Sequence, residues 1–107
     1  MRTHPETLET IIQRILAVGG PDKVVLFGSR ARDEARPDSD YDLLVIEDSD
    51  LPRYRRAARY RRALRDLRAA KDIVVWTPEE VAEWENVPNA FITQAINEGQ
   101  VLYERQA

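Results

Sequence analysis

The sequence contains no cysteine and a single histidine, His4, close to its start. The absence of cysteine excludes disulfides and zinc–thiolate sites, and it is compatible with a reducing cytoplasm. No histidine follows His4, so nothing in the body of the chain supplies Ser–His or Cys–His catalysis. Any metal must therefore be held by oxygen ligands, which favours Mg²⁺, Mn²⁺ or Ca²⁺.

Long apolar runs are also missing. None approaches the roughly 20 residues of a membrane span, and the first residues do not have the pattern of a signal peptide. We therefore expect a cytoplasmic protein without membrane contact. The length of 107 residues predicts one domain, covering residues 1–107.

The formal net charge of −3 is unevenly distributed. Nine basic residues and one acidic residue between Arg53 and Lys71 give this segment +8, so the remainder carries −11. The basic segment is interpreted as a solvated helix face, a contact for nucleic-acid phosphates, or a docking surface for an acidic partner protein. The acidity of the remainder argues against nonspecific nucleic-acid binding.

Apolar blocks separated by turn residues predict alternating helices and strands. Capping boxes begin the first helix at Thr3 and a later one at Thr77. Helices are predicted up to residue 18 and at about 31–35, 51–69, 78–87 and 91–98, and strands at 23–27, 41–47, 72–76 and, at an edge, 101–103. This order predicts an α/β or α+β domain, with a small mixed sheet of three to four strands flanked by helices. Tyr54 and Tyr60 fall on the apolar stripe of the helix at 51–69, which predicts that both lie in the core.

Two aspartates, Asp40 and Asp42, open the predicted strand at 41–47. Residues i and i+2 of a strand point to the same face, about 6.5–7 Å apart along the chain, so both carboxylates can approach one divalent ion or a close pair. By itself an Asp-x-Asp is more often a polar turn. However, Asp72 begins the next apolar strand at the corresponding position. If these strands are neighbours, three carboxylates converge at one end of the sheet.

A turn of small residues, Gly28-Ser29, closes the strand at 23–27. Glycine allows a ligand to approach the backbone closely, and free N–H groups at a following helix start attract phosphate. Ser29 offers a hydroxyl donor, and Arg30 and Arg32 offer charged donors. A lone Gly-Ser is most often an ordinary turn, and it gains weight here from the aspartates that follow.

The combined pattern resembles the DNA polymerase β-like nucleotidyltransferase superfamily. It consists of Gly-Ser-x-Ala-x, a spacer, Ser-Asp-x-Asp-Leu and a later aspartate on a strand. In this sequence these are Gly28 to Arg32, Ser39 to Leu43, and Asp72. The resemblance spans roughly residues 24–76, and the length of the chain points to the minimal nucleotidyltransferase branch, which is paired with HEPN-domain proteins in prokaryotic toxin–antitoxin operons. It implies the polymerase β-like fold.

The resemblance also implies roles for individual residues. Asp40 and Asp42 would bind two Mg²⁺ ions, and Asp72 would help hold the catalytic metal and favour deprotonation of the attacking hydroxyl. The implied nucleotide site, with Gly28 and Ser29 on the β- and γ-phosphates, comprises Gly28, Ser29, Arg30, Arg32 and Ser39. In a two-metal scheme the ions stabilise the attacking and leaving oxygens. The implied reaction is in-line attack on the α-phosphate of an NTP, with release of pyrophosphate.

One position departs from the family pattern, because Asp33 stands where members usually carry glycine. If that position needs a positive φ, aspartate is among the better substitutes and costs roughly 1 kcal/mol. Asp33 and Glu34 also add negative charge beside the phosphate turn. The departure affects loop geometry and nucleotide affinity, but it removes none of the three carboxylates.

The resemblance implies a Mg²⁺-dependent antitoxin that transfers AMP from ATP to a tyrosine hydroxyl of a HEPN toxin and so inactivates its RNase. No module for choosing an acceptor is recognisable, which favours a partner protein as acceptor and a hetero-oligomer, with the basic segment 53–71 as a candidate docking surface. Two alternatives stay open. In the first, the chain is a non-catalytic antitoxin that neutralises the toxin by binding. In the second, it is an enzyme that transfers a nucleotide to a small molecule or an RNA end.

Overall fold

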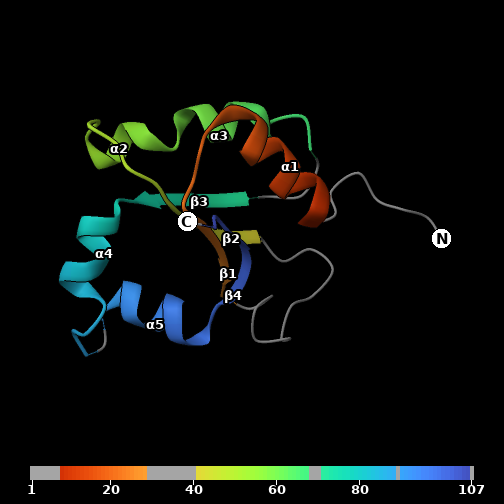
Figure 1. Ribbon diagram of the computed structural model, residues 1–107. Helices are drawn as coiled ribbons and strands as arrows, with labels where there is room; N and C mark the ends of the chain where they lie inside the picture. The colour runs from red at the N-terminus through yellow and green to blue at the C-terminus, as the bar shows by residue number, and fades with distance from the viewer. Residues whose placement is uncertain (1–7, 29–40, 68–70, 89, 107) are drawn as a thin grey trace.

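The computed structural model describes residues 8–28, 41–67, 71–88 and 90–106. The predicted helix at 31–35 and the capping box at Thr3 lie outside these residues. The elements, in chain order, are α1 Leu8–Val18, β1 Lys23–Phe27, β2 Tyr41–Ile46, α2 Arg53–Arg56, α3 Ala58–Ala63, β3 Lys71–Trp76, α4 Pro78–Trp84, α5 Phe91–Glu98 and β4 Gln100–Glu104. They form the α+β arrangement of Figure 1.

The four strands form one mixed sheet in the order β3-β2-β1-β4. Strands β2 and β3 run parallel, whereas β1 is antiparallel to both β2 and β4. The prediction of a small mixed sheet is confirmed, as is the edge strand near the end of the chain. Because β1 runs opposite to its neighbour, its last residue lies at the same end of the sheet as the first residues of β2 and β3.

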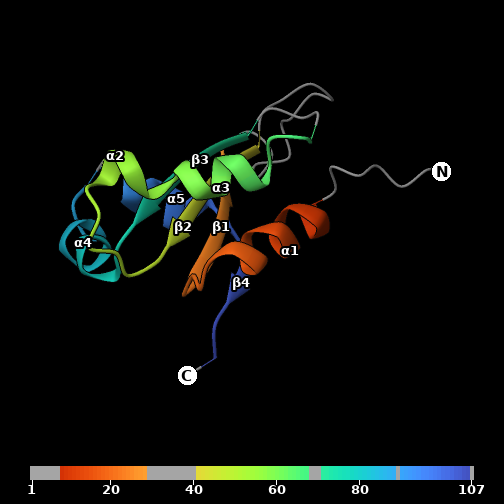
Figure 2. The same cartoon turned by 90° about the horizontal axis from the view of Figure 1, so that it is seen from above.

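Alternate side chains of the strands enter two separate cores, as the period of two requires. Leu43 and Val45 of β2 pack in a cluster with residues of α1 and α3, and Leu44 and Ile46 pack in a second cluster with residues of α4 and α5. Helices therefore cover both faces of the sheet, with α1 to α3 on one side and α4 and α5 on the other (Figure 1). Figure 2 shows α1 and α3 side by side over the first face. None of the described helices is long and apolar enough to span a membrane.

The helix predicted at 51–69 is instead two short helices, α2 and α3, joined at Ala57. Tyr60 is fully buried as predicted, but the prediction that Tyr54 lies in the core is wrong, since this residue is 80% exposed. The inner side of α2 is taken by Arg56, whose guanidinium hydrogen-bonds the carbonyls of Leu51 and Val75. Two residues along a helix differ by about 200° in direction, so Tyr54 points away from the sheet.

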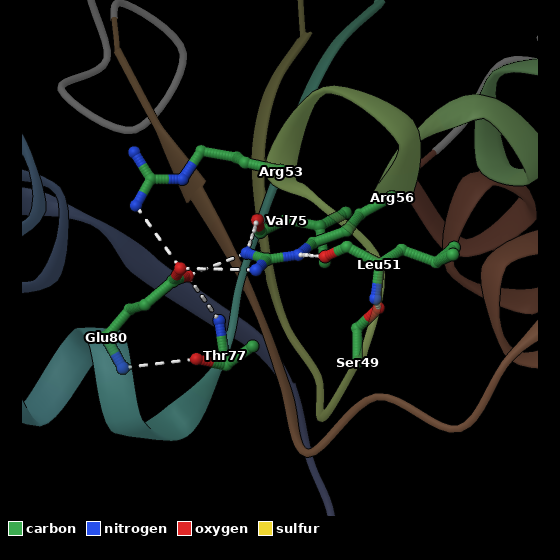
Figure 3. Close-up of polar contacts among 7 residues, drawn as sticks. All are labelled: Ser49, Leu51, Arg53, Arg56, Val75, Thr77 and Glu80. Carbon is green, nitrogen blue, oxygen red and sulfur yellow. Dashed lines mark hydrogen bonds and ion pairs between the residues drawn. The ribbon is translucent and has the colours of Figure 1, made fainter.

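The capping box predicted at Thr77 begins α4. The Thr77 hydroxyl accepts the N–H of Glu80 at 3.1 Å, and the Glu80 carboxylate accepts the N–H of Thr77 at 3.0 Å. The same carboxylate receives two guanidinium hydrogen bonds from Arg56, at 2.7 and 3.2 Å, and an ion pair from Arg53 at 3.4 Å (Figure 3). The Glu80 side chain thus fastens α2 to α4 near the carboxyl end of β3, whereas Asp72 lies near the amino end of that strand.

Candidate nucleotidyl-transfer site

The two described aspartates of the sequence motif lie side by side. Asp42 of β2 and Asp72 of β3 are register partners in the parallel pair. Registered residues of neighbouring strands share one face of the sheet and are separated by about 4.8 Å. Asp42 alternates with Leu44 and so shares the face covered by α4 and α5. The expectation that these strands are neighbours is confirmed, and their pairing places Asp42 beside Asp72. The convergence of three carboxylates stays a prediction, because Asp40 lies outside the described residues.

Gly28 brings the turn after β1 against the same pair. Phe27 is the register partner of Asp42, so the row Phe27–Asp42–Asp72 crosses three strands. Gly28 has a φ of 77°, and a Cβ placed on it would lie 2.2 Å from Oδ2 of Asp42. Only glycine satisfies both conditions, the left-handed backbone and the closeness of the carboxylate. The glycine of the predicted phosphate turn therefore belongs to the same site as the aspartates.

Several predicted site residues fall in a segment that the structure does not describe. These are Ser29, Arg30, Arg32, Ser39 and Asp40, together with Asp33, the departure from the family pattern. Their roles stay predictions. Within the described residues, Gly28, Asp42 and Asp72 are brought together.

A small pocket of about 120 Å³ adjoins Gly28, and sequence reasoning missed it. Its walls come from the end of β1 and from one side of α5: Phe27, Gly28, Phe91, Gln94, Ala95 and Glu98. The rings of Phe27 and Phe91 meet edge to face with centroids 5.1 Å apart. Phe91 remains 42% exposed although it begins an amphipathic helix. The exposed ring of Phe91 is the sequence feature that could have indicated a pocket. Its position next to Gly28 depends on the tertiary structure, which places α5 beside the end of β1.

The donor set at this end of the sheet is made of oxygen atoms, which fits Mg²⁺. Among the described residues no group of three or more His, Cys, Asp and Glu side chains is close enough to hold a metal ion. Asp42 and Asp72 supply two carboxylates there. The third ligand of the prediction, Asp40, is outside the described residues.

Among the described groups with a resolved shift, the largest changes of pKa belong to the scaffold at the opposite end of the sheet. The Arg56 guanidinium holds the pKa of Glu80 down at about 2. Burial, together with a hydrogen bond to Glu47, raises the pKa of the Tyr60 hydroxyl well above its usual value. Glu47 also pairs with Arg59 and directly follows β2, so these contacts fasten α3 to the sheet. They take no part in the site around Gly28.

Comparison with known proteins agrees with this geometry. The family model described as "Polymerase beta, Nucleotidyltransferase" matches residues 9–107, which is nearly the whole chain. Among curated proteins none matches the sequence.

A solved structure gives the same fold. One chain of the crystal structure of a toxin–antitoxin with AMP-PNP is similar to this protein with a TM-score of 0.62 and 20% sequence identity. The match covers 94% of this chain and 76% of that chain. At this identity the likeness concerns the fold, and it agrees with the mixed sheet and flanking helices described above. With the family match over residues 9–107, this chain belongs to the polymerase beta nucleotidyltransferase family.

Proposed function

We propose that this chain is an antitoxin that transfers AMP from ATP to a tyrosine hydroxyl of a HEPN-domain toxin. The observation that carries the transfer reaction is the register pairing of Asp42 with Asp72, with Gly28 held against Asp42. The pairing sets two oxygen donors next to each other on one face of the sheet, and oxygen donors are the ligands that Mg²⁺ prefers in proteins. Membership of the nucleotidyltransferase family supports the same reading.

Asp42 and Asp72, with Asp40, are the residues proposed to hold Mg²⁺. When bound, the ions neutralise phosphate charge and stabilise the attacking and leaving oxygens. The chain's own residues orient the reactants: Gly28 and Ser29 hold the β- and γ-phosphates, and Arg30, Arg32 and Ser39 complete the nucleotide site. Asp72 favours removal of the proton from the attacking hydroxyl. The new bond joins the tyrosine oxygen to the α-phosphorus as the bond to the bridging oxygen breaks, and pyrophosphate leaves.

The proposed acceptor and nucleotide rest on similarity. The structure that shares this fold is that of a toxin–antitoxin with AMP-PNP, an analogue of ATP. This supports a toxin as partner and ATP as donor for the present chain. The inactivation of an RNase is the proposed biological result.

The transfer is tested with purified protein, radiolabelled ATP, Mg²⁺ and, as acceptor, a HEPN-domain protein from the same genome. We expect label on a tyrosine of that protein, and a loss of about a hundredfold or more in rate for Asp42→Asn with Asp72→Asn, equivalent to about 2.7 kcal/mol of transition-state stabilisation. The matched control is Asp50→Asn, which removes an exposed carboxylate outside the site. Absence of label with the wild type, or equal labelling by the double variant, would overturn the proposal.

A second candidate is neutralisation by binding alone. It is favoured by exposed arginines of α2 and α3 that form no ion pair with described residues and lie away from the aspartates. It predicts that cells expressing the toxin survive equally well with the wild type and with the Asp42→Asn/Asp72→Asn variant. Rescue lost with the aspartates, at equal antitoxin level, favours transfer instead.

A further inference from the structure

The described arginines of the basic segment divide into two groups. Arg53 and Arg56 pair with Glu80, and Arg59 pairs with Glu47. These three are occupied in holding α2 and α3 to α4 and to the end of β2. They are therefore part of the scaffold, although the sequence does not distinguish them from their neighbours.

The other group is formed by arginines whose guanidinium groups make no ion pair or hydrogen bond with any described residue. These are Arg55, Arg61, Arg62 and Arg65, all of them exposed. Four guanidinium groups that no described acidic residue neutralises stand within eleven consecutive positions, in a chain whose remainder is acidic, and they form a strong local cationic surface. Pairing with the described part of the chain does not account for them.

Two members of this group line a groove that also has an apolar side. The groove has a volume of about 370 Å³, and its principal residues are Leu51, Tyr54, Arg55, Ala58, Arg59 and Arg62. Leu51 is 46% exposed and Tyr54 is 80% exposed. A tyrosine ring left this open contributes nothing to the core, whereas tyrosine and arginine are the side chains enriched among residues that dominate binding energy at protein interfaces.

We propose that this groove, called here the Tyr54 groove, docks an acidic segment of the partner toxin that carries an apolar side chain. The acidic residues pair with Arg55 and Arg62, and the apolar side chain packs between Leu51 and Tyr54. A protein segment fits better than a nucleic acid for two reasons. The aliphatic Leu51 makes no favourable contact with a phosphate backbone, and the acidic residues outside segment 53–71 repel nucleic-acid phosphates. The proposal rests on the proposed toxin partner but not on the transfer reaction.

The Tyr54 groove lies away from the nucleotidyl-transfer site. Arg56 and Arg59, which both line the groove, bond to Val75 and Glu47, which lie at the carboxyl ends of β3 and β2. Asp42 and Asp72 lie near the opposite ends of those strands. Docking and transfer therefore use different residues, and each can be removed without the other.

The test measures fluorescence anisotropy of a fluorescein-labelled peptide rich in aspartate and glutamate around a central leucine. Two further probes are the same peptide with asparagine and glutamine, and a single-stranded RNA. We expect the full chain to bind the acidic peptide, with affinity that falls as salt is raised. Arg55→Glu with Arg62→Glu, and separately Tyr54→Ser, should each weaken binding about tenfold or more.

The matched control is Arg61→Glu with Arg65→Glu, which makes the same change in net charge outside the groove and should alter affinity by about twofold at most. Asp42→Asn should bind the peptide like the wild type, which separates this proposal from that of nucleotidyl transfer. Equal loss in the control pair, equal binding of the amide peptide, tighter binding of the RNA, or no binding at all would each overturn the proposal. Apart from Asp42, which is half-buried, all altered side chains are exposed, and far-UV circular dichroism should report unchanged folding for every variant.

Discussion

Two separate constraints act on Gly28, its φ of 77° and the 2.2 Å that would separate an added Cβ from Asp42 Oδ2. Gly28→Ala should therefore destabilise the fold by about 1–2 kcal/mol, from the left-handed backbone and from displacement of the carboxylate. It should also weaken nucleotide binding, because Asp42 moves. Urea unfolding and titration with AMP-PNP in Mg²⁺ measure the two effects.

Gly20→Ala is the matched control for this prediction. A Cβ at Gly20 meets no atom within 4 Å, and its φ is not positive. Gly20→Ala should leave nucleotide binding unchanged. It should leave the free energy of unfolding equal or slightly higher, because alanine restricts the conformations of the unfolded chain. If Gly28→Ala bound AMP-PNP as well as Gly20→Ala does, the assignment of Gly28 to the site would be wrong.

At the scale of elements, Glu80 links α2 and α4, and its pKa is held at about 2 against an ordinary value of 4.5. A pKa lower in the folded state contributes stability that is fully present above about pH 4.5 and is lost as the pH falls through 2. Glu80→Gln keeps a capping-box residue but removes the charge. We expect it to cost about 1–3 kcal/mol at neutral pH.

The pH dependence distinguishes this ion pair from general packing. The difference in unfolding free energy between wild type and Glu80→Gln should shrink as the pH is lowered from about 4.5 to 2. Glu79→Gln, on an exposed neighbour in the same helical turn, should show little difference at any pH. A constant difference across this range would mean that the carboxylate charge does not hold α2 to α4.

Elements were predictable from sequence where the apolar pattern was simple. The β-branched runs gave β1 exactly, and β2 and β3 to within one residue. The segment 51–69 is helical over much of its length, but the helix is broken at Ala57. The placement of Tyr54 in the core was wrong, because Arg56 takes the inward position on α2 and Tyr54 points outward. Conversely, the adjacency of Asp42 and Asp72 depended on which strands pair, and spacing alone does not contain that information.

For the whole molecule, the proposed placement of nucleotide binding and partner docking at opposite ends of one sheet has a measurable consequence. If Gly28, Asp42 and Asp72 bind nucleotide, AMP-PNP with Mg²⁺ at ten times its Kd should stabilise the protein by about 1.4 kcal/mol. For a domain of this size the thermal midpoint then rises by about 6–11 °C. The Asp42→Asn/Asp72→Asn variant should lose this shift.

The Arg55→Glu/Arg62→Glu variant should retain the full shift while losing the acidic peptide, since its substitutions lie at the other end of β2 and β3. The Asp42→Asn/Asp72→Asn variant should bind the acidic peptide but lose the thermal shift. Differential scanning fluorimetry and peptide anisotropy on the same four proteins, with wild type and Arg61→Glu/Arg65→Glu completing the set, measure both properties. Substitutions at distant, independent sites act separately. If either variant lost both peptide binding and the thermal shift with AMP-PNP, docking and nucleotide binding would share one site.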